Sequence, residues 1–314
     1  MAVNAAPKIL VSIVNWNNTI VTNKCLAGIA AIPKADQPDI IVVDNHSTSQ
    51  KFDIDANVTK NLRSLKVVMN PDNKGFAGGH NPNIRQAQQN GYDYIFLLNN
   101  DSEIIDKSIF VTITRALAEN PKALGANPTI LSRLKPDIIW YGGGQLSLSN
   151  GSAGHLRVGQ KLTDQPAAPQ ATGLLTGCCL AISLKQASLE NLLLSEKYFL
   201  YWEDTDWSAR ALKAGFELLY VPEAKLLHHV SDSLGVRSPN YIYYNIRNHF
   251  LFVKNNLGRL NQVLALWNIL VITAKYKFNI LFRYDHDRIK SLKTVWRAWF
   301  DGLRGRGGRL QRPL

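Results

Sequence analysis

"YIFLLNNDSEI" (residues 94–104) indicates the type of fold most directly, because four apolar residues, Ile95 to Leu98, run directly into a cluster of amides and acids. A short apolar run bounded by polar residues is typical of an interior parallel strand that is buried on both faces. Open α/β sheets bind their ligands beyond the carboxyl ends of such strands. The residues that follow the strand are therefore candidate ligand-binding residues or, alternatively, loop-capping residues: Asn99, Asn100, Asp101 and Glu103.

Two earlier strands lead into polar residues in the same way. A strand within 8–17 ends at Asn15 and Asn17, and a strand beginning at residue 39 ends at Asp44, before a Ser/Thr cluster. A third strand, from residue 64, precedes the Gly-rich "NKGFAGGHN" (73–81), and we expect helices over 21–31 and 82–90. Strands that alternate with helices indicate βαβ units and a mostly parallel sheet.

The later part of the chain is less regular. Residues 127–170 are rich in Gly, Pro, Ser and Asn, which predicts hairpins or a long loop near the site. "ATGLLTGCCLAISL" (171–184) predicts another strand, and a helix should begin at the acids of "YWEDTDWSAR" (201–210) and end before Gly215. A last strand over 217–221 precedes the double histidine His228 and His229.

From residue 238 the pattern becomes helical, and the basic excess is concentrated there. Residues 288–312 contain eight Lys and Arg against the single acid Asp301. We therefore expect two parts, a sheet domain over 1–237 and an amphipathic, basic helical region over 238–314. A basic helix that carries Trp296 and Trp299 favours a position on a membrane surface. The alternative is an ordinary amphipathic helix docked on the sheet domain.

The composition limits the classes of partner. The chain has 314 residues, of which 46% are hydrophobic and 19% charged, which is ordinary for a folded protein. Its net charge of +12 favours anionic partners. Nucleic acid is not expected, because the basic residues lie in the tail rather than on the sheet domain.

The cysteines and the N-terminus indicate the compartment. Three cysteines form no metal-ligand pattern, which is typical of a reducing compartment. The N-terminus has no signal-peptide pattern, and no run reaches the roughly 18 uninterrupted apolar residues of a spanning helix. We expect a cytoplasmic protein.

Three groups of residues suggest binding chemistry. Asp101, together with Asn99 and Glu103, could hold a divalent cation, since hard cations prefer carboxylate and amide oxygens. Asp44 could accept hydrogen bonds from a ribose hydroxyl or a base N–H, or it could cap the next helix. The backbone N–H groups at Gly75, Gly78 and Gly79 suit an anionic or closely packed ligand.

The acidic cluster in "YWEDTDWSAR" is the most informative motif. Crowded carboxylates raise one another's pKa, which suits a general base, although acids also favour a helix N-terminus for electrostatic reasons alone. Arg210 lies four residues after Asp206 and should pair with it, which leaves Glu203 and Asp204 for chemistry. The double histidine could supply one nitrogen ligand to the metal.

In this order along residues 8–255, the motifs resemble the family 2 glycosyltransferases of GT-A fold, particularly the bacterial rhamnosyltransferase-like branch. The motifs that carry the resemblance are "VSIVNWN", "VVDNHSTS", "NKGFAGGHN", "LLNND", "GCCLAI", "YWEDTDWSAR", "HHVSDS" and "YYNIRN". The chain departs from the family pattern at Asn99, where many relatives have an acid, and at His80, Pro82 and Asn83.

The resemblance implies a role for each site residue. Asp204, with Glu203 beside it, would be the general base. Asp101 would hold Mg²⁺ or Mn²⁺ on the donor diphosphate, and His228, rather than His229, would be a further ligand. Binding of the nucleotide-sugar donor would fall to Asn15, Asn17, Asp44, Asn73, Gly78, Asn81 and Asn100.

The implied activity is an inverting sugar transfer at the inner face of the bacterial plasma membrane. The donor expected from the family is dTDP-L-rhamnose, and the acceptor is a polyprenyl-diphosphate-linked or growing surface polysaccharide. Two alternatives stay open: the same fold with a UDP-hexose or UDP-galactofuranose donor, and a non-catalytic, membrane-associated module that binds nucleotide sugars.

Overall fold

Strand β4 (Tyr94–Asn99) lies in the interior of the sheet, as its sequence predicts. Its four apolar side chains, Ile95 to Leu98, are fully buried, because alternate residues point into core clusters on opposite faces of the sheet. It pairs in parallel with β1 (Ile9–Asn15). This is a computed structural model, and it describes residues 6–49, 51–229, 238–282 and 287–310.

The main sheet has ten strands. The order along its length is β10-β12-β6-β11-β4-β1-β2-β3, with β5 paired to β12 and β7 to β6, while β8 and β9 form a separate hairpin. The strands β4, β1, β2 and β3 are parallel, so their carboxyl ends share one edge. The remaining strands are β2 (Asp39–Asp44), β3 (Leu65–Met69), β5 (Ser102–Ile104), β6 (Ala123–Ser132), β7 (Lys135–Tyr141), β8 (Gly144–Leu146), β9 (Ala153–His155), β10 (Gln170–Ala171), β11 (Cys179–Ser183) and β12 (Glu217–His228).

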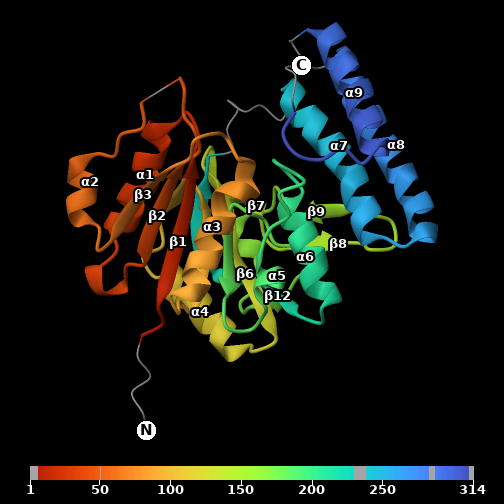
Figure 1. Ribbon diagram of the computed structural model, residues 1–314. Coiled ribbons are helices and arrows are strands. Elements are labelled where there is room, and N and C mark those ends of the chain that lie inside the picture. Colours follow the sequence, from red (N-terminus) through yellow and green to blue (C-terminus); the bar gives the residue numbers. More distant parts are fainter. Residues whose placement is uncertain (1–5, 50, 230–237, 283–286, 311–314) are drawn as a thin grey trace.

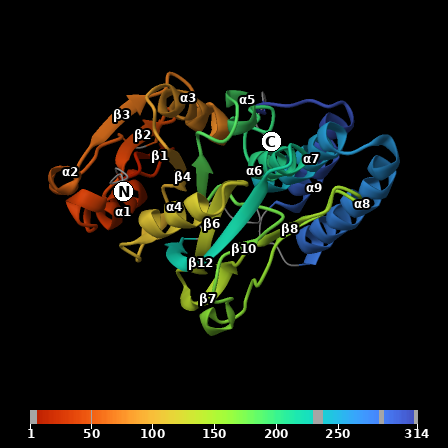
Figure 2. The same cartoon turned by 90° about the horizontal axis from the view of Figure 1, so that it is seen from below.

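Helices cover both faces of the sheet (Figures 1 and 2). Side chains of α1 and α4 belong to the core cluster on one face, and side chains of α3, α5 and α6 belong to the cluster on the other face. The predicted α/β fold is confirmed. The helices are α1 (Thr19–Ala30), α2 (Ala56–Asn61), α3 (Gly75–Gln89), α4 (Ile109–Glu119), α5 (Leu189–Leu192), α6 (Glu203–Lys213), α7 (Pro239–Asn256), α8 (Arg259–Phe282) and α9 (Arg288–Leu303), with short 3₁₀ turns η1 (Lys34–Asp36) and η2 (Leu162–Asp164).

Helix α3 begins at Gly75, earlier than the expected start near residue 82. The glycines allow close packing rather than a turn: a Cβ on Gly79 would lie 2.7 Å from Val14 Cγ2, so the helix rests directly on β1. Gly75 has φ of +71°, and a Cβ there would overlap the Phe199 carbonyl oxygen. Pro82 lies inside the helix, where its missing N–H removes one backbone hydrogen bond.

The second half of the chain adds antiparallel pairs. β11 runs antiparallel to β4, and the predicted hairpins of 127–170 are present, although residues 127–132 belong to the buried strand β6. The last strand, expected over 217–221, continues as β12 to His228. The first of the two histidines is therefore the last residue of a strand, rather than part of a following loop.

Helices α7, α8 and α9 pack together beside the sheet domain (Figure 1). Their shared core cluster includes Tyr198 and Ala209 of the sheet domain. The predicted boundary at 237/238 adjoins residues 230–237, which lie outside the described part of the chain, and the division stays a prediction. Helix α8 has 24 residues and is long and apolar enough to cross a membrane by length and composition alone, with 22% of its most apolar window buried.

Helix α7 holds the segment that leads into α6. Phe199, Tyr201 and Trp202 all have positive φ, between 65° and 76°, a conformation that costs non-glycine residues about 1–3 kcal/mol each. The buried Asn248 amide donates to three carbonyls of this segment, those of Tyr198 (3.0 Å), Leu200 (2.8 Å) and Tyr201 (2.8 Å). These bonds stabilise the left-handed backbone immediately before Glu203.

We expect Asn248→Asp to lower the free energy of unfolding by about 3 kcal/mol, since the isosteric carboxylate keeps the acceptor for Arg247 Nε (2.8 Å) but cannot donate to the three carbonyls. Urea denaturation followed by tryptophan fluorescence measures the change. Asn245→Asp, on the same helix with a single bond to Tyr241 O, is the matched control. Equal losses in the two variants would contradict this role for Asn248.

Candidate active site

The predicted nucleoside-binding residues meet at the carboxyl edge of the sheet. Asn15 and Asp44 are paired across β1 and β2, and Asn15 Nδ2 donates to Asp44 Oδ1 over 2.7 Å. The second oxygen of Asp44 accepts the backbone N–H of Ser47 at 3.0 Å. Asn17 Oδ1 accepts the N–H groups of Thr48 (2.7 Å) and Ser49 (3.0 Å). These side chains fix the loop after β2 and bring the predicted group together.

Asn45 is a residue that the sequence analysis missed. It is buried, its Oδ1 accepts the Lys74 N–H at 3.0 Å, and its Nδ2 donates to Asn73 Oδ1 (3.1 Å) and to Gly75 O (3.0 Å). It therefore joins the loop after β2 to the start of α3 and holds the predicted residue Asn73 at the same edge. Its position directly after Asp44 in the sequence is the feature from which it could have been identified.

Residues of the Gly-rich motif are already hydrogen-bonded within the protein. The Gly75 N–H donates to Asn73 Oδ1 at 2.9 Å, so it is not the open donor that we expected. Gly78 lies within α3. Asn81 is buried and exchanges two bonds with the backbone of Leu194, at 2.9 and 3.0 Å. In this structure Asn81 ties α3 to the segment before α6, and donor-binding roles for Gly78 and Asn81 stay predictions.

The unusual residues His80 and Asn83 form a buried polar group with Ser12. His80 Nδ1 lies 2.8 Å from Ser12 Oγ, which also accepts from Asn83 Nδ2 at 2.8 Å. Burial lowers the pKa of His80 to about 3, so the imidazole is neutral. This departure from the family pattern serves the packing of α3 on β1.

Asp101 and His228 lie side by side. The pairing of β5 with β12 places them there, and Asp101 Oδ1 lies 3.1 Å from His228 Nε2. Burial acts to lower the pKa of His228, but the Cys178 sulfur and the Asp101 carboxylate outweigh it and raise that pKa to about 11. The His229 ring instead contacts Arg133 and lies 3.5 Å from Glu103 Oε2.

This pair fits a divalent cation. Without a metal, the raised pKa keeps His228 protonated, so binding of a cation would displace that proton. A carboxylate oxygen and a neutral imidazole nitrogen are ligands that Mn²⁺ accepts, and Mg²⁺ commonly takes one or two protein carboxylates plus phosphate oxygens. Two ligands of one octahedral ion, each ~2.1 Å from it, lie about 3 Å apart, which matches the observed 3.1 Å. Among the described residues no group of three or more His, Cys, Asp or Glu side chains could hold a metal. A substrate would have to supply further ligands.

The acid pair begins helix α6. Asp204 Oδ2 accepts the Gly177 N–H at 2.9 Å, and its Oδ1 accepts the Thr205 N–H at 2.7 Å. Glu203 is buried, and burial together with the neighbouring Asp204 charge raises its pKa to about 8. Glu203 therefore keeps its proton at neutral pH, while the half-buried Asp204 remains within reach of solvent.

Asp206, the third acid, is structural. Its carboxylate accepts from Arg210 Nε at 2.9 Å, from the Tyr198 hydroxyl at 2.9 Å and from Asn256 Nδ2 at 2.7 Å. The predicted pairing with Arg210 is confirmed. The bond from Asn256 also ties α6 to the end of α7.

Gly177 and Cys178 connect the acid pair to the Asp101–His228 pair. Gly177 N donates to Asp204, while Cys178 O accepts the N–H of Asn99 at 2.9 Å. The Cys178 sulfur lies 3.5 Å from Ser102 Oγ, and Ser102 is the partner of His228 across β5 and β12. Because these two residues are consecutive, both predicted pairs lie at the same end of β4.

Asn100 and His155 complete this region. Asn100 Nδ2 donates to Thr22 Oγ1 at 3.0 Å, which anchors the end of β4 to α1. His155, at the end of β9, has its ring centroid 4.7 Å from that of Trp140, whose ring also packs edge-on against His228. Burial lowers the pKa of His155, while the charge of Asp204 opposes that shift. Sequence reasoning missed His155, since a lone histidine in a Gly/Ser-rich stretch gave no signal.

Comparison with known proteins identifies relatives of similar sequence. The chain is 24% identical over 275 residues to the dTDP-rhamnosyl transferase RfbF of Shigella flexneri, covering 85% of this chain and 86% of that protein. It is 33% identical over 81 residues, 26% of each chain, to an N-acetylglucosaminyl-diphospho-decaprenol L-rhamnosyltransferase of Mycobacterium tuberculosis.

Solved structures share the fold. The mannosyltransferase PcManGT of Pyrobaculum calidifontis, in complex with GDP-Man and Mn²⁺, superposes with a TM-score of 0.57 at 14% identity, over 96% of this chain and 88% of that one. GalNAc-T7 with UDP, GalNAc and Mn²⁺ gives 0.61 at 15% identity, over 80% of this chain and 48% of that one. The sequence profile described as "Glycosyltransferase like family 2" matches residues 7–242. The chain belongs to the family 2 glycosyltransferases.

Proposed function

We propose that the chain transfers L-rhamnose from dTDP-L-rhamnose, with inversion, to a lipid-linked or growing surface-polysaccharide acceptor. The similarity to RfbF, along 85% of the chain, supports this donor. The structural observation that carries the proposal is the link through Gly177 and Cys178. Gly177 contacts Asp204, and Cys178 contacts Ser102, the strand partner of His228, so that Asp204 lies at the same sheet edge as Asp101 and His228. A base and a diphosphate-binding pair at one edge are what a sugar-nucleotide transferase needs.

The donor would lie along the carboxyl edge of β1, β2 and β4. Asp44 and Asn15 would bind the nucleoside, with Asn17 and Asn73 fixing the surrounding loops. Carboxylates at this position after a strand bind ribose hydroxyls in other nucleotide-binding folds. The diphosphate would then extend toward Asp101, since β4 lies next to β1 in the sheet.

Asp101 and His228 would hold a divalent cation, Mg²⁺ or Mn²⁺. When bound, such an ion neutralises the negative charge that develops on the leaving nucleoside diphosphate. Asn99 lies at the end of β4 with its backbone N–H bonded to Cys178 O. The family resemblance implies an acid at this position in many members, where this chain has the Asn99 amide, so the protein would contribute one carboxylate and one imidazole to this site.

Asp204 would act as the general base. It accepts the proton of the acceptor hydroxyl, whose oxygen attacks the anomeric carbon and forms the new glycosidic bond. The bond from that carbon to the phosphate oxygen breaks, and its electron pair leaves with the nucleoside diphosphate. Attack opposite to the leaving group inverts the anomeric configuration. The protonated Glu203 limits the negative charge next to this base.

The proposed setting is the cytoplasmic face of the bacterial plasma membrane, with the enzyme bound peripherally. The M. tuberculosis relative is named for a decaprenol-linked diphosphate acceptor, which supports a polyprenyl-diphosphate acceptor here. Such an acceptor places the reactive hydroxyl close to a lipid surface.

Asp204→Asn should lower kcat for transfer by at least ~100-fold and leave donor binding unchanged, because the amide cannot accept the proton. A panel of nucleotide sugars, with a polyprenyl-diphosphate glycan acceptor, measures turnover, and calorimetry measures donor binding. Asp36→Asn, an exposed acid that precedes the amino end of β2, opposite to the end that carries Asp44, should behave as wild type. Turnover of only a UDP-hexose or UDP-galactofuranose would contradict the rhamnose assignment, and full activity of Asp204→Asn would contradict the base assignment.

Removal of divalent metal with EDTA should abolish transfer, and Mn²⁺ or Mg²⁺ should restore it. We expect His228→Ala to raise the metal concentration for half-maximal activity at least ~10-fold. His229→Ala, the adjacent histidine that faces Arg133 and Glu103, should change it little. Equal effects of the two variants would show that His228 is not the ligand.

Glu203→Gln tests the protonated acid. The folded state retains the Glu203 proton up to pH about 8, while the unfolded chain releases it near 4.5, so the wild type should lose up to ~1.4 kcal/mol of stability per pH unit across that window. The glutamine variant lacks this loss, and its stability relative to wild type should therefore rise with pH between about 5 and 8. Urea unfolding at a series of pH values measures it. A difference between Glu203→Gln and wild type that stays constant over this pH range would contradict the shifted pKa of Glu203.

A further inference from the structure

Helix α8 is apolar on two opposite faces. One face packs in the protein through Ala265, Ile269, Thr273 and Ile280. The opposite face is exposed to solvent, and a surface helix of a soluble domain normally places polar residues there. Its large apolar side chains, with exposed fractions between 36% and 86%, are Leu260, Val263, Leu264, Leu266, Trp267, Leu270, Val271, Phe278, Leu281 and Phe282.

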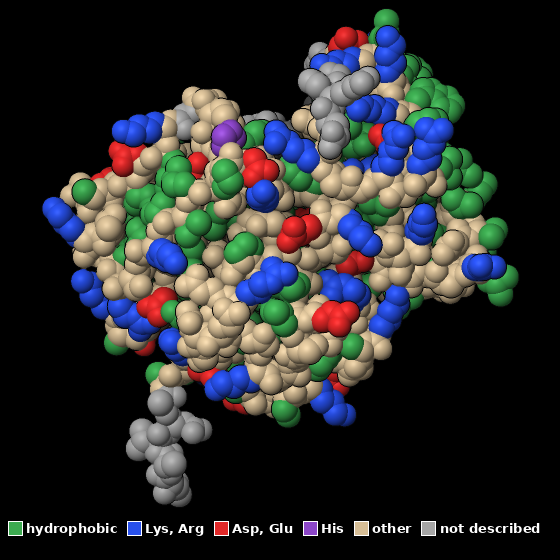
Figure 3. Space-filling model, viewed as in Figure 1, with side chains coloured by type: hydrophobic (Ala, Val, Ile, Leu, Met, Phe, Trp, Pro, Cys, Tyr) green, Lys and Arg blue, Asp and Glu red, His purple; other side chains and the backbone are tan. Residues whose placement is uncertain are grey.

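Helix α9 extends this apolar surface. Ile289, Trp296, Phe300 and Leu303 are between 49% and 68% exposed, and their spacings of seven, four and three residues place them on one side of the helix. The two helices meet at a groove of about 260 Å³ whose lining includes Leu270 and Trp296. We call the exposed apolar residues of the two helices the α8/α9 face. Figure 3 shows hydrophobic side chains gathered at this edge of the molecule, with Lys and Arg among them.

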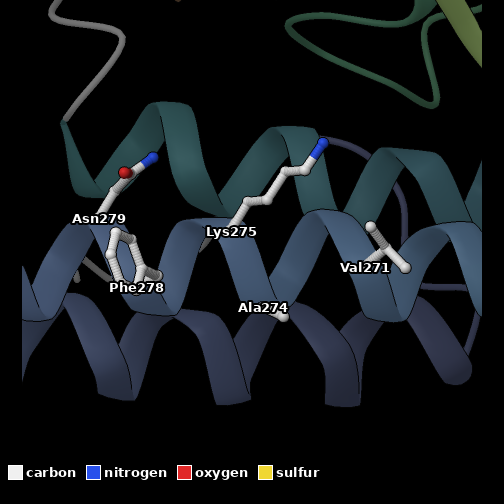
Figure 4. A pocket seen from close by; sticks show the side chains of 5 residues that line it. All are labelled: Val271, Ala274, Lys275, Phe278 and Asn279. Carbon is white, nitrogen blue, oxygen red and sulfur yellow. The ribbon is translucent and has the colours of Figure 1, made fainter.

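The charge beside the α8/α9 face is positive. Helix α8 contains no Asp or Glu, and its Lys275 and Lys277 lie on either side of the exposed apolar stripe, since they are three residues before and one residue before Phe278. Lys277 Nζ lies 4.4 Å from the Trp296 ring centroid, and the Arg304 guanidinium lies 3.5 Å from that of Phe300. Lys275 also lines a second groove, of about 590 Å³, with Val271 and Phe278 (Figure 4).

Polar contacts fix the orientation of α8 on the protein. Asn268 Nδ2 donates to Asn150 O at 2.7 Å, and Asn261 Nδ2 donates to Leu148 O at 3.2 Å. Trp299 Nε1 of α9 donates to Thr273 Oγ1 at 2.9 Å. A membrane-spanning α8 would have to break these bonds and expose its packed face. A helix that lies flat in the membrane interface keeps these hydrogen bonds and still buries its exposed apolar face.

We propose that the α8/α9 face binds the surface of a membrane that contains anionic lipids, with both helices lying in the interface. The apolar residues enter the boundary between headgroups and acyl chains, and the surrounding Lys and Arg side chains contact lipid phosphates. The same positive charge disfavours the pairing of two copies of this face. This inference rests on the proposed function, which includes a lipid-linked acceptor. It adds the surface that would bring the enzyme to the membrane that carries this acceptor.

Sedimentation with lipid vesicles tests the proposal without donor or acceptor, so its outcome is independent of any failure of the transfer assay. The full chain should bind vesicles that contain phosphatidylglycerol, bind pure phosphatidylcholine vesicles at least ~10-fold more weakly, and dissociate in alkaline carbonate. Retention after carbonate extraction would overturn the in-plane arrangement in favour of a spanning α8.

Two variants identify the surface. Trp267→Ser/Trp296→Ser and Lys275→Glu/Lys277→Glu should each weaken binding to the anionic vesicles at least ~10-fold. Leu134→Ser/Val158→Ser, which removes two exposed apolar residues of the sheet domain, is the matched control and should bind as wild type. Absence of vesicle binding, or equal effects of the control and the tryptophan variant, would overturn the proposal. A different outcome would assign the α8/α9 face to a second copy of the chain: no vesicle binding, together with a dimer in analytical ultracentrifugation that is lost only in the tryptophan variant.

Discussion

The antiparallel pairing of β11 with β4 is the constraint on which the active site depends. Because the strands run in opposite directions, the beginning of β11 lies at the carboxyl end of β4, beside Asn99 and Asp101. Gly177 and Cys178 directly precede β11. Gly177 N–H donates to Asp204, and Cys178 contacts Ser102, the partner of His228 across β5 and β12. A parallel strand in the same position would have presented its far end to this edge. The site therefore follows from strand direction as much as from the identity of the acids.

The approach to α6 shows how strained backbone is maintained at the site. Three non-glycine residues with positive φ within four positions would be unstable in isolation, and the contacts of α7 offset this cost. Besides the bonds from Asn248, the Phe199 ring stacks on Tyr244 at 5.4 Å and Trp202 stacks on His249 at 4.4 Å. The first C-terminal helix therefore determines where the acid pair is placed, even though its own residues lie outside the predicted catalytic group.

The sequence was sufficient where local patterns decide the structure. The run from Ile95 to Leu98 predicted a buried central strand, and the spacing of Asp206 and Arg210 predicted their ion pair. It was insufficient where a contact joins distant segments. Asn45 and His155 owe their positions to α3 and to the packing around Trp140, which no local pattern encodes.

The start of α3 shows the same limit for secondary structure. A glycine cluster usually indicates a turn, yet here it forms the first turn of a helix because Val14 and the Phe199 carbonyl leave no room for side chains. The extension of β12 to His228 likewise depends on its partner strands β5 and β6, which are remote in sequence. Tertiary contacts therefore determine where α3 begins and where β12 ends.

The hairpin of β8 and β9 connects helices α7 and α8 with the active-site region. Its tip is held between α7 and α8, where the Gly151 carbonyl lies 2.9 Å from His249 Nε2 and the Asn150 carbonyl accepts from α8. Four residues further along the chain, ~13 Å when extended, His155 packs edge-on against Trp140, whose ring also contacts His228. In the proposed membrane-bound arrangement, this short spacer would hold the active site at a constant distance from the lipid headgroups.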